Sequence, residues 1–179
     1  MAEAPAPAIG PGSGTGRGTV SGPAIGPVTD WPARLAAALA RAGGPTSDHD
    51  LNPGLAPAPG SLRPAAVLVA IEGDQLILTK RSSRLSHHPG QIAFPGGRFD
   101  PGDASAVAAA LREAEEEIGL PPAAVEVLGT LAPHTTVTGF SVTPVVGRLR
   151  AAYTPRPEPG EVDEVFNVPL AHVLDPGKY

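Results

Sequence analysis

The spacing and size of the apolar residues divide the chain near residue 61. Before that point alanine, proline and glycine dominate, whereas valine, leucine and isoleucine recur in short runs after it. A segment with few bulky apolar side chains cannot bury enough surface to offset the conformational entropy lost on folding. We therefore expect residues 1–60 to be a mostly disordered tail and residues 61–179 to form the folded domain.

One segment of the tail, residues 31–42, has the pattern of a short helix. Asp30 precedes it as an N-cap, a proline lies in its first turn and two glycines follow its end, which are start and stop signals. Trp31, Leu35 and Leu39 recur at intervals of four residues and so form one apolar stripe. We expect this stripe to dock on the domain.

Within the domain, short apolar runs bounded by turn residues predict strands. These runs cover residues 65–71, 75–79, 91–94, 125–131, 141–149 and 162–168. The first two runs flank a glycine-containing hairpin turn, residues 95–97 have the composition of a turn, and residues 132–140 that of a loop. One helix, over about residues 104–118, lies among the strands. This order indicates an α/β (α+β) fold with a mixed sheet.

Asp103 and Ser105 are both able to cap the predicted helix, and Gly119 is its expected stop. On a helical wheel one stripe of the helix is apolar and predicts packing on the sheet. Glu113, Glu116 and Glu117 lie together beside that stripe, within about 100° of arc. The other residue of the acidic run, Glu115, points nearly opposite, toward solvent.

The three glutamates allow two interpretations. A solvated acidic face is one of them, because like charges at this spacing cost only about 0.2–0.5 kcal/mol per pair. A divalent cation is the other, because it would remove both this repulsion and the unfavourable position of acids near a helix C-terminus. Carboxylate ligands suit Mg²⁺ or Mn²⁺, with water and phosphate oxygens completing the coordination.

Charge and composition exclude several classes of function. The formal net charge of −5 argues against a generic binder of nucleic acid or of anionic membranes. The chain has no cysteine, which excludes disulfides, thiolate nucleophiles and zinc sites with cysteine ligands. No apolar run has the length of a membrane span, and the first residues lack the apolar core of a secretion signal. We expect a cytoplasmic protein.

The acidic helix lies within a longer motif. Residues 97–103 followed by residues 112–120 resemble the Nudix box, whose pattern is Gly-x5-Glu-x7-Arg-Glu-U-x-Glu-Glu-x-Gly-U, where U is a bulky aliphatic residue. The second half matches closely, with the small Ala114 at the first U. In the first half, Asp103 replaces glutamate, and one extra residue separates it from Arg112.

The same departure is typical of the coenzyme A-type branch of Nudix hydrolases. The upstream motif of that branch is similar to residues 78–82 continued by residues 89–97, although Ser86 stands where a second arginine is frequent. Downstream, residues 135–140 and 142–146 resemble the same branch. The resemblance covers residues 64–174 and implies a mixed sheet sandwiched by helices. Members of the family usually continue into a further C-terminal helix, which we expect to be missing here.

The resemblance implies roles for particular residues. Glu113, Glu116 and Glu117 would hold Mg²⁺ or Mn²⁺, and Arg112 would brace these carboxylates, although an ordinary helix ion pair with Glu116 has the same spacing. Glu116 and Arg112 are thus the expected catalytic residues. The backbone would approach metal and phosphate at Gly96 and Gly97, where a plain turn would have the same sequence.

Arg81 and Arg84, beside two histidines, form a basic patch that suits a polyanionic substrate, although a solvated loop would have the same composition. The candidates for the general base are Glu116, Glu161 and Glu164. His134 follows a predicted strand and could reach the site or be simply exposed. Asp103 is expected to cap the helix.

The expected partner is therefore a small-molecule diphosphate, with no nucleic acid and no membrane. The expected reaction is Mg²⁺-dependent hydrolysis of coenzyme A or acyl-CoA to 3′,5′-ADP and the (acyl-)4′-phosphopantetheine. Two alternatives stay open: another substrate of the family, such as ADP-ribose, NADH or a nucleoside triphosphate, and a Nudix-like binding module without catalysis.

Overall fold

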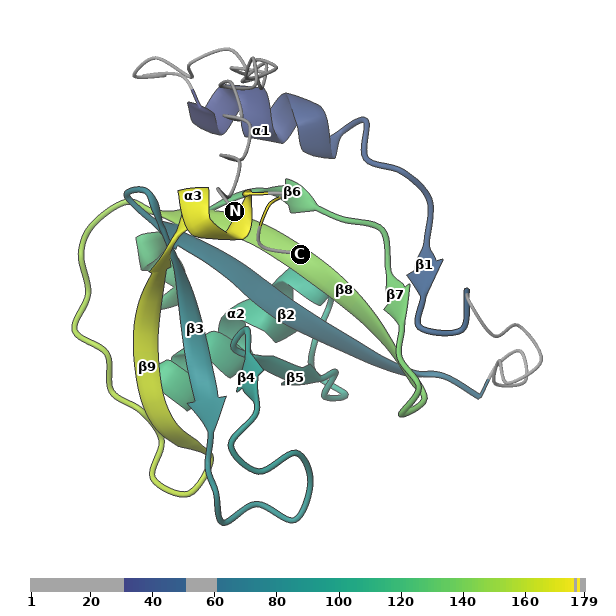
Figure 1. Cartoon of the computed structure of the whole chain (residues 1–179), viewed down its shortest axis with the longest axis vertical. Helices are drawn as coiled ribbons and strands as arrows, with labels where there is room; N and C mark the ends of the chain where they lie inside the picture. The colour runs from purple at the N-terminus through teal and green to yellow at the C-terminus, as the bar shows by residue number, and fades with distance from the viewer. Residues whose placement is uncertain (1–30, 51–60, 176, 178–179) are drawn as a thin grey trace, which may run out of the picture.

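The computed structural model describes residues 31–50, 61–175 and 177 (Figure 1). At its centre, β2 (Arg63–Glu72) pairs in parallel with β8 (Phe140–Leu149) along nearly its whole length. Antiparallel β6 (Val125–Thr130) and β7 (His134–Thr135) continue the sheet on the far side of β8. The sheet is therefore mixed, as the order of the predicted elements indicated.

The other edge of β2 is divided between two partners. Near the hairpin turn, β2 pairs with β3 (Gln75–Arg81) only at residues 71–72, and the two strands then diverge. Farther along, residues 65–67 of β2 pair with β5 (Gly96–Arg98). Between these pairings, the Leu68 N–H donates to the Pro95 carbonyl at 2.8 Å. This divergence leads the chain through the middle of the sheet and places a glycine pair beside β2.

Strand β3 continues away from β2 and has strands of its own on both edges. It pairs with β4 (Ile92–Ala93) on one side and with β9 (Val162–Pro169) on the other. Its register with β9 is irregular at Lys80 and Arg81, where β3 ends. The end of β3 and the start of β9 are thereby brought near the glycine pair, although they are far apart in sequence.

The long helix α2 (Ala106–Ile118) covers one face of the sheet (Figure 1). Ser105 caps its start, because its hydroxyl accepts from the Ala108 N–H, and Gly119 ends it in the left-handed conformation at φ 70°. Small side chains on its inner stripe let the helix lie close to β2. The core between them consists of Ala66, Leu68, Ala70, Ile77, Ala109, Ala110, Ala114, Ile118, Leu120, Val125 and Val145.

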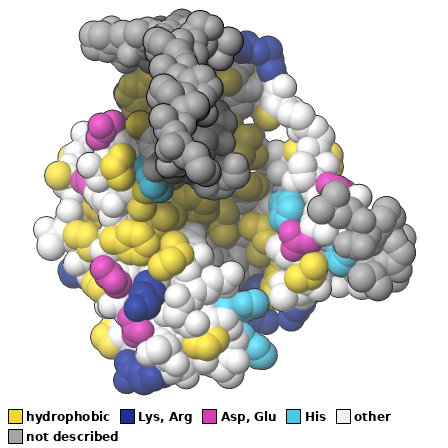
Figure 2. Space-filling model, viewed as in Figure 1, with side chains coloured by type: hydrophobic (Ala, Val, Ile, Leu, Met, Phe, Trp, Pro, Cys, Tyr) yellow, Lys and Arg dark blue, Asp and Glu magenta, His cyan; other side chains and the backbone are white. Residues whose placement is uncertain are grey.

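The opposite face is covered by α1 (Trp31–Leu39) and the short α3 (Leu170–Val173). The predicted stripe of α1 packs against a second apolar cluster of Ile71, Leu76 and Val146. Figure 2, which looks onto this face, shows apolar side chains gathered across it. The sheet thus lies between helices on its two faces, as the fold class predicted.

Residues 31–50 are also joined to the sheet by a short strand that the sequence analysis did not predict. Strand β1 (Thr46–Ser47) pairs in parallel with β7. Strand β7 itself lies inside residues 132–140, which were expected to be a loop. The His134 ring bridges the two strands, with Nδ1 2.8 Å from the Thr46 hydroxyl and Nε2 2.9 Å from Asp48. Of the tail expected to be mostly disordered, residues 1–30 and 51–60 lie outside the described residues.

Two further local predictions were wrong. The glycine pair predicted as a turn belongs to β5, since hydrogen bonding to β2 makes this segment a strand. Asp103 does not cap α2, because Ser105 does so and the Asp103 carboxylate binds Arg112 instead. The first outcome depends on β2, which is far away in the sequence, whereas the second depends on Arg112, nine residues after Asp103. Across the described residues, every helix is too short or too polar to cross a membrane.

Candidate active site

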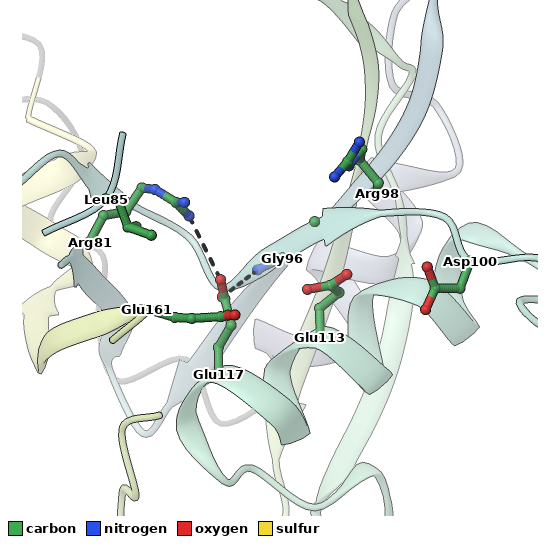
Figure 3. Close-up of a pocket in the computed structure, with 9 residues that line it drawn as sticks. Arg81, Leu85, Gly96, Arg98, Asp100, Glu113, Glu117 and Glu161 are labelled. Carbon is green, nitrogen blue, oxygen red and sulfur yellow. Dashed lines mark hydrogen bonds and ion pairs between the residues drawn. The ribbon is translucent and has the colours of Figure 1, made fainter. Parts of the chain in front are cut away.

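An open pocket lies between α2 and β5, with a cavity volume of about 290 Å³ (Figure 3). Four separate segments build its walls: the end of β3 with the loop that follows, the strand β5 with the turn after it, the helix α2, and the loop before β9. The lining residues are Arg81, Leu85, Gly96, Gly97, Arg98, Asp100, Glu113, Glu117 and Glu161.

Two of the predicted metal ligands, Glu113 and Glu117, lie on successive turns of α2 and face the pocket (Figure 3). Glu117 is buried, and its Oε2 accepts the Gly96 N–H at 2.9 Å. Its Oε1 lies 3.8 Å from Nη1 of Arg81. Helical spacing therefore brings the two carboxylates to one place, as predicted, and β5 supplies the backbone against which they lie.

Neither glycine of β5 has room for a Cβ without a neighbour moving, which is backbone at Gly96 and a flexible side chain at Gly97. A Cβ on Gly96 would collide with the Ala66 carbonyl oxygen, inside the contact of β5 with β2. A Cβ on Gly97 would lie 2.5 Å from both carboxylate oxygens of Glu113. The glycine pair thus keeps the strand close to its neighbour and leaves room for a carboxylate directly against the backbone.

The two carboxylates are poorly neutralised. Burial raises the pKa of Glu117 to about 7, and the Glu113 charge adds to this, whereas the Gly96 N–H and Arg81 act in the opposite direction. Burial also raises the pKa of Glu113, against the attraction of Arg112. Glu161 adds further repulsion at Glu117. Negative charge therefore accumulates in a partly buried pocket, an arrangement that a cation relieves.

Arg112 ties the helix to the turn that follows β5. Its Nε and Nη2 bind the two oxygens of Asp103 at 3.2 and 2.9 Å, and Nη2 also donates to the Arg98 carbonyl at 3.0 Å. Its Nη1 lies 3.1 Å from Glu113 and 2.8 Å from Glu116. The hydrogen bond from Arg112 lowers the pKa of Asp103. The spacing alone did not decide between an ion pair with Glu116 and a contact that braces the carboxylates. Arg112 makes both, because it binds Glu116 and also joins Glu113 to Asp103.

The structure does not bring every predicted residue to the pocket. The side chain of Glu116 is 60% exposed and bound to Arg112, and it is not part of the lining. Arg84 does not line the pocket either, although its neighbour Leu85 does. Helical spacing places Glu116 beside Glu113, but the position of β5 decides which of the glutamates lie against this strand.

Among the candidates for the general base, Glu161 alone belongs to the lining of this pocket. Glu164 lies within β9 opposite Lys80. The loop before β9 is fixed on α2, because the Glu158 N–H donates to the Glu117 carbonyl at 2.9 Å. His134 is hydrogen-bonded to Thr46 and Asp48, away from the pocket, and is not among the lining residues.

Arg98 belongs to the site, although no sequence pattern predicted it. It belongs to the lining of the pocket, and Figure 3 draws its side chain on the other side of the β5 ribbon from Glu113 and Glu117. Arg98 lies within residues 97–103, which resemble the first half of the Nudix box, but at a position where the pattern allows any residue. Two further lining residues were not predicted: Asp100, at another free position of this pattern, and Leu85, between the two parts of the upstream motif.

The donor groups fit a magnesium ion with few protein ligands. Within the described ranges, no three His, Asp or Glu side chains form a preassembled metal-binding group. Mg²⁺, however, keeps several water molecules and commonly uses one or two carboxylates together with substrate phosphates. Glu113 and Glu117 supply such a pair of hard oxygen ligands, and the room left by Gly97 keeps the first of them against the strand.

Comparison with known proteins identifies what the chain is similar to. The model of the NUDIX domain matches residues 61–178. The uncharacterized Nudix hydrolase NudL of Escherichia coli strain K12 is 53% identical over 120 residues, which are 65% of this chain and 62% of the relative. NudL of Shigella flexneri is 50% identical over 132 residues, 72% of this chain and 69% of the relative. The aligned part thus spans about three fifths of the length of the E. coli relative.

Solved structures agree on the fold. The Nudix hydrolase RenU of M. smegmatis superposes with a TM-score of 0.51 at 27% identity, covering 64% of this chain and 78% of that one. A C. elegans Ap4A hydrolase in a binary complex has the same TM-score at 22% identity, covering 64% of this chain and 86% of that one.

The space left by Gly97 generates the first prediction. In Gly97→Ala, the new methyl group displaces the Glu113 carboxylate, and we expect Mn²⁺ affinity to fall at least about tenfold. Unfolding is affected little, because the displaced group is the end of a flexible side chain. Gly102→Ala is the matched control, since nothing lies within 4 Å of its Cβ position. Calorimetric titration with Mn²⁺ measures the effect; equal affinities in the two variants would contradict it.

The raised pKa of Glu117 generates the second prediction. A carboxyl group that binds its proton more tightly in the folded protein stabilises the fold fully below about pH 4.5 and loses this contribution as the pH rises through about 7. In metal-free buffer, wild type should therefore lose about 3 kcal/mol relative to Glu117→Gln between pH 4.5 and 8. Urea unfolding across this range measures the difference, and parallel pH profiles would refute the assignment.

Proposed function

The chain belongs to the Nudix hydrolase family, and from this premise we propose that it hydrolyses a diphosphate linked to a nucleoside with Mg²⁺ or Mn²⁺ at Glu113 and Glu117. The observation that carries the proposal is the convergence of these two partly buried carboxylates on the β5 backbone. Among the described residues, two guanidinium groups lie near these charges, that of Arg81 at 3.8 Å from Glu117 and that of Arg112 at 3.1 Å from Glu113. A divalent cation bound there would neutralise charge on the diphosphate oxygens and lower the pKa of a bound water.

The chain's own residues then divide the remaining tasks. Arg112 orients Glu113 and joins it to Asp103, so that the carboxylate keeps its direction when the pocket fills. Glu116 acts through this arginine and not as a direct ligand, because it lies outside the lining. Glu161 is the carboxylate that remains free to accept a proton from the attacking water.

For the substrate, coenzyme A or an acyl derivative is favoured by the segment 78–97. Its parts 78–82 and 89–97 resemble the motif of the coenzyme A-type branch, and Arg81, Gly96 and Gly97 of the pocket lining come from them, with Leu85 in the loop between them. The loop around Leu85 also carries Arg84 and two histidines. These groups suit the additional 3′-phosphate, which coenzyme A carries besides its diphosphate.

The third prediction concerns this substrate. Incubation of the protein with Mg²⁺ and coenzyme A should release 3′,5′-ADP and 4′-phosphopantetheine, because water breaks the bond between the two phosphoryl groups. Chromatography of the nucleotide products measures the reaction beside ADP-ribose, NADH and nucleoside triphosphates. Faster hydrolysis of one of these three substrates would move the specificity away from coenzyme A without changing the reaction class.

The fourth prediction separates an enzyme from a binding module. Glu117→Gln should lower kcat about 100-fold or more, because it removes one of the two charges that hold the cation. Glu115→Gln, on the exposed side of the same helix, should leave kcat unchanged within about twofold. Steady-state assays with both variants test this. If wild type turns over none of the four substrate classes yet binds one of them, the chain is a binding module.

A further inference from the structure

Arg81 faces one particular carboxylate oxygen of the proposed cation site, Oε1 of Glu117. Of the two carboxylate oxygens of Glu117, Oε2 accepts the Gly96 N–H at 2.9 Å, which leaves Oε1 for other partners. Nη1 of Arg81 lies 3.8 Å from this Oε1 (Figure 3). The guanidinium therefore faces the oxygen that remains available to a cation.

The backbone of Arg81 is held, whereas its side chain has room to move. The Arg81 N–H donates to the Gln91 carbonyl at 2.9 Å, and the Arg81 carbonyl accepts the Gly90 N–H at 3.1 Å. The side chain is 30% exposed, against 7% for Glu117. An ion pair at this distance that water can reach is weak. A change of its partner therefore requires only a rotation of the arginine side chain.

We propose that Arg81 and the divalent cation compete for Oε1 of Glu117, so that cation binding releases the Arg81 guanidinium to bind a phosphate group of the substrate. The inference rests on the proposed function and adds an order of events to it. A monovalent guanidinium and a dication repel each other when both approach one oxygen. The released side chain stays at the pocket wall, where phosphate oxygens provide the bidentate acceptor that guanidinium prefers.

Arg98 provides the internal comparison, because it carries the same charge in the same pocket. In the part of the chain that the structure describes, its guanidinium makes no hydrogen bond and no ion pair. It therefore has no carboxylate partner to give up when the cation binds. Removal of Arg98 takes one positive charge from the pocket without freeing Glu117.

The fifth prediction follows from this comparison. In the absence of any diphosphate, Arg81→Gln should bind Mn²⁺ about threefold to tenfold more tightly than wild type, because the competing guanidinium is gone. Arg98→Gln should stay within about twofold of wild type at physiological ionic strength. Arg81→Lys retains the competing charge and should restore the wild-type affinity. Titration calorimetry or Mn²⁺ electron paramagnetic resonance measures these affinities with the full chain.

A second titration tests the released arginine. With Mn²⁺ saturating, Arg81→Gln should bind the non-hydrolysable α,β-methylene-ADP several-fold more weakly than wild type, so that the substitution has opposite effects on the two ligands. Equal Mn²⁺ affinities of Arg81→Gln and Arg98→Gln, or Arg81→Lys binding as tightly as Arg81→Gln, would overturn the competition. If no protein of the set binds Mn²⁺, the proposed function fails together with this inference.

Discussion

The close packing of two glutamate side chains against the glycine backbone of β5 is the constraint on which the site depends. A carboxylate can lie directly on Gly97 only because no Cβ is present there, and Gly96 must also be small because β5 lies tightly on β2. The Gly96 N–H partly compensates Glu117, but one hydrogen bond does not neutralise two carboxylates. Burial combined with incomplete compensation gives the pocket its tendency to bind cations.

The sheet is built so that this packing becomes possible. Because β2 and β3 separate after their hairpin, the chain enters the middle of the sheet and β5 lies beside β2 under the helix. Ser105 and Gly119 set the two ends of α2, and Arg112 locks the helix to the turn after β5 through Asp103. The rotation of the helix is thereby fixed, and with it the direction of Glu113 and Glu117.

The charges of the pocket are divided by the elements that carry them. The carboxylates come from α2, from the loop before β9 and, with Asp100, from the turn after β5, whereas Arg81 and Arg98 come from β3 and β5. A diphosphate bound with a cation needs both kinds of group, since the carboxylates hold the metal and the guanidinium groups bind phosphate oxygens. Competition between Arg81 and the cation at Glu117 would couple the two halves of the pocket.

Local patterns in the sequence determined the elements and part of the site. Alternating and helical spacing predicted the long strands, α2 and the docking stripe of α1, because these features depend on residues a few positions apart. They also placed Glu113 and Glu117 on one face of the helix. The sequence singled out the glycine pair that lies against the two carboxylates. Its assignment to a turn was wrong, because the pair becomes a strand only through its hydrogen bonds to β2.

Tertiary structure decided which charged groups meet. Glu116 lies on the same side of α2 as Glu113 and also binds Arg112, but it stays outside the pocket lining. Arg98 and Glu161 reach the pocket from β5 and from the loop before β9, and no local spacing in the sequence places them opposite the helix. The pairing of β1 with β7 likewise required a distant partner, whereas Ser105 caps the helix through a local bond to the Ala108 N–H while Asp103 binds Arg112. Periodicity along a chain predicts which face of a helix or strand a residue occupies. Packing of the whole chain determines which other element lies against that face.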